Sequence, residues 1–214
     1  MRYTSMTPRP SPLSRASLGG FSLIELLVVL LIVSLLIALA LPALSAARQR
    51  ATGTACLSNL RQLGTAVEVY LGNHDEVFPK ARYMPLPFLT TLYTPGIDEV
   101  EYPALPIRLD AEVDRESKVW RCPGDEGDVY ELTETAGEAA TSYEYHHTLG
   151  ERTIEQSWMV RRLGLQPSQV WVLRDFDGGA DITLMDGSTV NIPFFHEERN
   201  FVFADGHAAA DVEF

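Results

Sequence analysis

Four histidines are the first candidates for chemistry in this chain. His146 and His147 are adjacent, and because neighbouring residues on a strand point to opposite faces, they form a poor chelating pair. His196 and His207 stand apart from each other. The sequence contains no zinc-type ligand spacing, no Gly-x-Ser-x-Gly elbow and no phosphate-binding loop. These observations predict that the protein is not an enzyme.

Three aspartates that gather at a predicted turn offer hard oxygen ligands of the kind that calcium prefers. They are Asp175, Asp177 and Asp181. They do not match the EF-hand loop, and aspartate also occurs at turns because its side chain bonds the local backbone. We therefore expect no cofactor. Calcium in the acidic C-terminal region remains the open alternative, with its ligands unassigned.

Two cysteines, Cys56 and Cys122, are too few for a disulfide scaffold, and neither belongs to a Cys-x-x-Cys pair. The two cysteines therefore give little support for a redox or zinc-binding function. A single Cys56–Cys122 bridge is chemically allowed if this part of the chain lies outside the cytoplasm. The sequence leaves the bridge undecided, because it does not give the distance between the two residues.

Charge is distributed very unevenly along the 214 residues. Residues 73–214 carry a formal charge of −16, from 11 basic and 27 acidic side chains, whereas the first 20 residues contain three arginines and no acid. So acidic a region would be repelled by nucleic acid and by an anionic membrane surface. We expect no nucleic-acid partner.

An apolar segment of 21 residues, Phe21 to Leu41, contains a single charge, Glu25. As a helix rising ~1.5 Å per residue it would be roughly 31 Å long, enough to cross a bilayer. An ordinary secretory signal with its cut at Ala43–Ala47 is one interpretation of this segment. Against it, the apolar run is longer than usual, and a buried carboxylate near its start costs several kcal/mol unless it is paired.

The junction between the leader and this segment carries a specific motif. It is Gly20-Phe21-Ser22-Leu23-Ile24-Glu25-Leu26-Leu27-Val28-Val29. The motif resembles the prepilin cleavage and methylation site of type IV pilins and type II secretion pseudopilins. Pro42 also falls at the mature position where many pilins carry a proline.

The resemblance implies cleavage between Gly20 and Phe21 by a prepilin peptidase, with N-methylation of Phe21. It implies a single-pass protein of the bacterial inner membrane with a periplasmic head. Its partners would be other pilin-like subunits and a pilus or secretion machinery. Glu25 would neutralise the N-terminal amine of a neighbouring subunit during assembly. The local alternative is that Glu25 complements the positive end of the helix dipole.

The periodicity of the N-terminal half predicts one long helix over residues 22–71, ending near Gly72-Asn73, with Pro42 bending rather than ending it. We expect a cleaved leader (1–20), a transmembrane half (21–41), an amphipathic half (42–72) and an acidic head (73–214). The apolar stripe expected to pack on the head is Leu44, Ala47, Ala51, Ala55, Leu60, Leu63, Val67, Tyr70 and Leu71.

The C-terminal third predicts antiparallel strands. Asp186-Gly187 and Asp205-Gly206 each separate two apolar segments, which indicates two hairpins with tight turns. A strand at 170–173 precedes them, Asp177-Gly178-Gly179 is a predicted turn, and a strand signal occurs at 118–121. Residues 79–110 and 124–141 are expected to be loops. The prediction is an α+β, pilin-like fold with a four- or five-stranded sheet covered by the helix.

The head also contains segments similar to one branch of the pseudopilins. That branch carries a C-terminal sequence signature, in which nine residues separate a histidine from an Asp-Gly pair. Here eight residues separate His196 from Asp205-Gly206. We interpret the missing residue as a shortened loop. The other similar segments are 56–64, Phe78-Pro79 and 121–125. The alternative to a filament subunit is a membrane-tethered extracytoplasmic binding module that does not polymerise.

Overall fold

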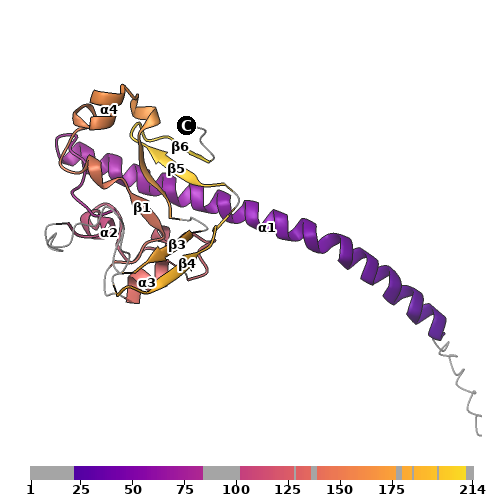
Figure 1. The fold of residues 1–214 in the computed structure, drawn as a ribbon. Helices are drawn as coiled ribbons and strands as arrows, with labels where there is room; N and C mark the ends of the chain where they lie inside the picture. Colours follow the sequence, from indigo (N-terminus) through magenta and orange to yellow (C-terminus); the bar gives the residue numbers. More distant parts are fainter. Residues whose placement is uncertain are drawn as a thin grey trace, which may run out of the picture. The chain divides into compact units, whose positions relative to one another are not determined.

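The computed structural model describes residues 22–83, 102–127, 129–135, 139–176, 180–184, 186–196 and 198–210. The chain divides into two compact units, Met1–Leu44 and Ser45–Phe214. One long helix and a C-terminal antiparallel sheet give an α+β architecture (Figure 1). The predicted leader lies outside the described residues.

Helix α1 spans Leu23–Asn73, with Pro42 inside it, which confirms the predicted long helix. It is long and apolar enough to cross a membrane, with a mean hydropathy of 3.1 over its most apolar window. Its large apolar side chains from Leu23 to Leu44 are all exposed. The hydroxyl of Ser34 donates to the carbonyl oxygen of Leu30 at 2.7 Å, so this polar group is paired within the helix.

The second half of α1 belongs to the core of the unit Ser45–Phe214. The predicted stripe is right from Leu60 onward and wrong before it: Leu44, Ala47, Ala51 and Ala55 are exposed. Alanine is the best helix former, so alanines at helical spacing are well tolerated on exposed helix faces and do not mark where packing begins. The buried residues of α1 are Cys56, Leu60, Leu63, Gly64, Ala66, Val67 and Leu71.

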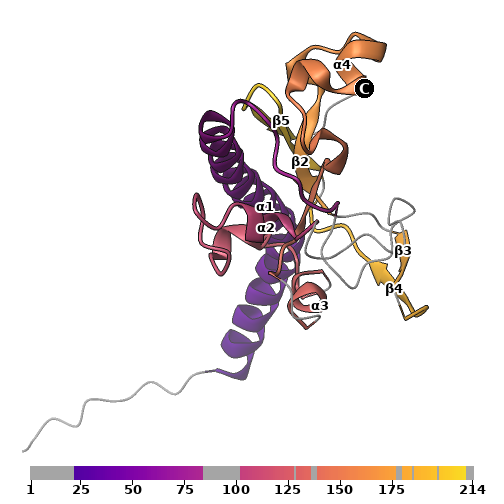
Figure 2. The same cartoon turned by 90° about the vertical axis from the view of Figure 1, so that its left-hand side faces the viewer.

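The main sheet has four antiparallel strands in the order β1-β2-β5-β6. The strands are β1 (Tyr143–Tyr145), β2 (Trp171–Asp175), β5 (Asn200–Phe203) and β6 (Ala208–Ala210). The second half of α1 runs alongside β5 in both views (Figures 1 and 2). Residues of the helix and of these strands share one hydrophobic core. The predicted covering of the sheet by the helix is confirmed within this unit.

The hairpin of β3 (Ala180–Thr183) and β4 (Thr189–Ile192) forms a separate two-stranded sheet, contrary to the single sheet predicted. The reason is that β1 pairs with one edge of β2 and β5 with the other, so β2 has no edge left for the hairpin. The pairing within both predicted hairpins is confirmed.

The two-residue hairpin turn that Asp-Gly favours needs positive φ at both residues, and both Asp-Gly turns differ from this geometry. Only the glycines have positive φ, 84° at Gly187 and 83° at Gly206. The amide of Gly206 donates to the Phe203 carbonyl, and the amide of Phe203 donates to the carbonyl of His207. This is a three-residue loop ending in a glycine bulge, which needs one left-handed residue rather than two. The predicted turn at 177–179 lies outside the described residues.

Two other predictions fail in short helical segments. The strand signal at 118–121 is instead η1 (Lys118–Trp120), because the Ser117 hydroxyl caps it by accepting from the amide of Val119. The predicted loop 124–141 contains α3 (Tyr130–Thr135), whose first amide donates to the buried carboxylate of Asp125. Within 79–110, α2 (Leu105–Arg108) is regular, whereas 84–101 lies outside the described residues.

The remaining elements lie between β1 and β2. They are η2 (His147–Leu149), η3 (Ile154–Gln156), α4 (Trp158–Leu163) and η4 (Pro167–Gln169).

Candidate functional site

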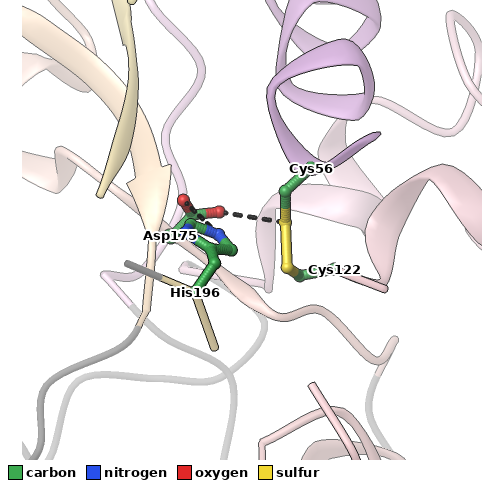
Figure 3. A group of neighbouring side chains, drawn as sticks. All are labelled: Cys56, Cys122, Asp175 and His196. Atoms are coloured by element: carbon green, nitrogen blue, oxygen red, sulfur yellow. Dashed lines mark hydrogen bonds and ion pairs between the residues drawn. A yellow bond between two sulfur atoms is a disulfide. The ribbon is translucent and has the colours of Figure 1, made fainter. Parts of the chain in front are cut away.

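Four buried side chains with metal-type donor atoms meet inside the unit Ser45–Phe214 (Figure 3). Cys56 comes from helix α1, Cys122 follows η1, Asp175 is the last residue of β2, and His196 follows β4. One donor atom from each lies within 4.8 Å of all the others. Among the described residues, this is the one such group of three or more His, Cys, Asp or Glu side chains.

A disulfide joins Cys56 to Cys122, with their Cα atoms 5.1 Å apart. Both residues are fully buried. The structure thus brings together the pair for which the sequence left a bridge undecided. The bond connects α1 covalently to a segment 66 residues away in the sequence, at the point where the helix enters the core.

Asp175 is a fully buried carboxylate, so its oxygens need polar partners. Its Oδ2 accepts a hydrogen bond from the backbone amide of Asn200 at 2.8 Å and lies 3.1 Å from Nε2 of His196. Its Oδ1 lies 3.3 Å from Sγ of Cys56. A disulfide sulfur carries no hydrogen, so this last contact is a hydrogen bond only when Cys56 is a thiol.

The imidazole of His196 is held from both sides and is 1% exposed. Its Nδ1 faces the backbone carbonyl of Glu198, which can only accept, so Nδ1 carries a hydrogen. Nε2 lies between the Asp175 carboxylate and the side-chain amide of Asn200, 3.3 Å away. That amide also donates to the carbonyl of Gly53 in α1. The histidine therefore presents Nε2 to the cluster.

The other three histidines that the sequence suggested, His146, His147 and His207, lie outside this cluster. His146 packs against Trp171, with ring centroids 4.3 Å apart, and burial lowers its pKa to about 4. Burial also lowers the pKa of its neighbour His147, whose ring meets Tyr83 edge-on. His207 is exposed, stacks on Phe203 and pairs with Asp205.

The three aspartates considered for calcium have different surroundings. Asp175 belongs to the buried cluster, whereas Asp181 is exposed on β3 and accepts from the side chain of Asn191 at 2.9 Å. Asp177 lies outside the described residues. Calcium binding stays an open alternative that rests on composition alone.

Of the residues predicted for processing and assembly, Gly20 and Phe21 lie outside the described residues. Glu25 is in the first turn of α1, where its carboxylate accepts from the backbone amide of Ser22 at 3.0 Å. This contact is local to the start of the helix, and it does not decide between a role in assembly and a local role beside the helix dipole.

None of the predictions from the sequence placed Asp175 and His196 beside the two cysteines. Two signals bore on this site: we interpreted His196 as the histidine of the branch signature, and we found both cysteines in segments similar to that branch. Neither signal gives distances in space. No family model, curated protein or solved structure matches the chain.

Proposed function

We propose that this chain is a pilin-like subunit. A prepilin peptidase cleaves it between Gly20 and Phe21 and methylates Phe21. The mature chain is inserted in the inner membrane with its acidic head in the periplasm, and it joins other pilin-like subunits in a pilus or secretion pseudopilus.

The observation that carries this proposal is the division of α1. Its first half is apolar and exposed, with Glu25 as the sole charge, and it directly follows the Gly20-Phe21 motif. Its second half is built into the core of the compact unit Ser45–Phe214. A chain of this design can stand in a membrane by its first half and expose a folded head. Parallel copies of the apolar half would bury one another's side chains in a filament.

The course of α1 also bears on the secretory alternative. The helix continues without interruption through Ala43–Ala47, the segment that would contain an ordinary signal-peptidase site. A cut in this segment would remove the apolar half of α1 from the mature chain.

Processing is tested by coexpressing the full chain with a prepilin peptidase and measuring the intact mass. Removal of 20 of the 214 residues should leave a chain of 194 residues that begins at N-methylated Phe21. Gly20→Ala should slow or block cleavage, whereas the neighbouring Gly19→Ala should be processed normally. A mature N-terminus at residues 46–48 would instead establish the secretory interpretation.

A further inference from the structure

We propose that in the thiol form of the chain Cys56, Cys122, Asp175 and His196 bind one Zn²⁺ ion. The ligands are the two Sγ atoms, one carboxylate oxygen of Asp175 and Nε2 of His196. This site does not depend on the proposed function.

The donor set suits zinc better than any other common ion. Two thiolates and an imidazole are soft or borderline ligands, which exclude calcium and magnesium, and four ligands from sulfur, nitrogen and oxygen satisfy tetrahedral zinc. In such a site, bonds of roughly 2.0–2.3 Å place neighbouring ligand atoms about 3.3–3.8 Å apart. The four donor atoms lie within 4.8 Å of one another, so the two sulfurs must separate and the widest pair must approach by about 1 Å.

Each ligand also has the supporting partner that zinc sites show. Nδ1–H of His196 donates to the carbonyl of Glu198, and Nε2 is directed at the cluster, 3.1 Å from Oδ2 of Asp175. The Asp175 carboxylate is held by the amide of Asn200. These contacts fix the two non-sulfur ligands before any ion arrives.

The sulfurs have hydrogen-bond donors of their own. The amide of Gly124 donates to Sγ of Cys122 at 3.4 Å, and the hydroxyl of Tyr143 lies 3.5 Å from Sγ of Cys56. A disulfide sulfur is a weak acceptor, whereas a zinc-bound thiolate carries negative charge and accepts strongly. The donors around the sulfurs are therefore better matched to the metal-bound form than to the disulfide.

Two thiolates, one carboxylate and Zn²⁺ leave a net charge of −1 in the interior, which the amides of Gly124 and Asn200 and the hydroxyl of Tyr143 partly offset. A cavity of about 430 Å³ lies beside the cluster, and His196 is the one of the four ligands in its lining. An ion entering there would reach His196 first.

The disulfide and the zinc site are alternative states of the same two cysteines. A phosphine and water convert the disulfide into two thiols and a phosphine oxide. The two thiols then bind Zn²⁺ and release two protons. The site is thus open to metal in a chain that is still reduced, as newly made chains in the cytoplasm are, and closed once the disulfide forms.

The test uses the full chain in detergent micelles, reduced with a phosphine, stripped of metal and titrated anaerobically with Co²⁺. One equivalent should bind, with thiolate-to-cobalt charge transfer and the intense visible bands of tetrahedral cobalt, and Zn²⁺ should displace it. The same chain in its disulfide form is the matched control and should give no such spectrum. Equal binding by both forms, or none by the reduced form, overturns the proposal.

Two variants assign the non-sulfur ligands. Asp175→Asn keeps the shape and an oxygen acceptor for the Asn200 amide, and Asp181→Asn makes the same change at an exposed site. Loss of a partner that only supports a metal ligand costs up to ~100-fold in metal affinity, so loss of the ligand itself should cost at least as much. Asp175→Asn should therefore weaken Co²⁺ binding by ~100-fold or more. Asp181→Asn should leave the affinity for Co²⁺ unchanged. His196→Ala should likewise weaken Co²⁺ binding, and its control His207→Ala should leave the affinity for Co²⁺ unchanged.

A variant that does not fold would leave the wild-type comparison between reduced and oxidised chains as the deciding measurement. Zn²⁺ should also slow alkylation of both cysteines in the reduced wild-type chain. Folded Asp175→Asn and His196→Ala chains that bind Co²⁺ as tightly as wild type would overturn the four-ligand site.

Discussion

Gly64 of helix α1 and Val202 of strand β5 lie so close that a Cβ on residue 64 would stand 2.8 Å from Cγ1 of Val202. Val202 is buried and β-branched, so it cannot turn aside. Gly64→Ala should therefore push the helix from the sheet. We expect it to destabilise the head by about 1–3 kcal/mol, although alanine gains up to ~1 kcal/mol in helix propensity. Urea unfolding of the full chain, followed by tryptophan fluorescence, measures this.

Gly72→Ala provides the control in the same helix. A Cβ at that position would meet no atom within 4 Å, so the substitution should be neutral or stabilising by up to ~1 kcal/mol. If the two alanine variants unfolded at the same urea concentration, the close packing of α1 on β5 would be wrong.

The stability of the head should fall as the pH is lowered from about 6.5 to 4. Burial depresses the pKa of His146 to about 4, whereas the unfolded chain binds that proton near the usual pKa of ~6.5. Between these values the unfolded state binds more protons, so stability is lost as the pH decreases, by about 2 kcal/mol at pH 5. Unfolding free energies at pH 7 and pH 5 measure the loss.

His146→Gln removes this titration and should make the pH dependence flatter than in the wild type. Identical slopes for the wild type and His146→Gln would show that His146 is not buried as a neutral imidazole.

Local signals predicted the elements well because each depends on a few neighbouring residues. The apolar periodicity gave the helix to within two residues at its end, and the two Asp-Gly pairs located both hairpins. The strand signal at 118–121 failed because one capping hydroxyl, that of Ser117, outweighed the β-preference of Val119 and Trp120.

The sequence did not predict which distant segments of the chain contact each other. The sheet was misassigned because edge pairing of β1 with β2 joins residues about thirty positions apart, Tyr143 with Asp175. The buried cluster unites four residues from four separate segments of the chain, and one sequence does not state which strand end faces which turn of a helix. The same limit applied to the disulfide, whose residues are 66 positions apart.

Glu25 permits a test that separates assembly from local capping. Gln keeps an oxygen that can accept from the Ser22 amide but carries no charge, whereas Leu has neither. If Glu25 neutralises a neighbouring subunit's amine, Glu25→Gln and Glu25→Leu should both be inserted in the membrane yet fail to join wild-type filaments. Cosedimentation of tagged variants with sheared filaments measures this.

The pattern of failure decides between the roles. Normal incorporation of Glu25→Gln, with loss only in Glu25→Leu, would assign Glu25 to the helix end. Normal incorporation of both would make it dispensable. A wild-type chain that inserts but never cosediments would favour the tethered, non-polymerising module.

We expect the second half of α1 to be essential to the core of the unit Ser45–Phe214. A fragment comprising Ser45–Phe214 matches the compact unit and should be soluble and unfold cooperatively. A fragment beginning at Asn73 loses the buried side chains of Leu60, Leu63 and Val67. Each such loss typically costs ~2–5 kcal/mol, and a domain has only ~5–15 kcal/mol in total. The shorter fragment should therefore be aggregated or molten, with no near-ultraviolet circular dichroism.

The shorter fragment also lacks Cys56, so Ser45–Phe214 with Cys56→Ser is the matched control. That control removes the disulfide and keeps the helix. We expect it to be less stable than its parent by the ~2–4 kcal/mol typical of one bridge, yet still folded. Collapse of this control together with the shorter fragment would assign the stability to the disulfide. Cooperative unfolding of the fragment that begins at Asn73 would show that the sheet needs no helix, and the pilin-like architecture would then have to be given up.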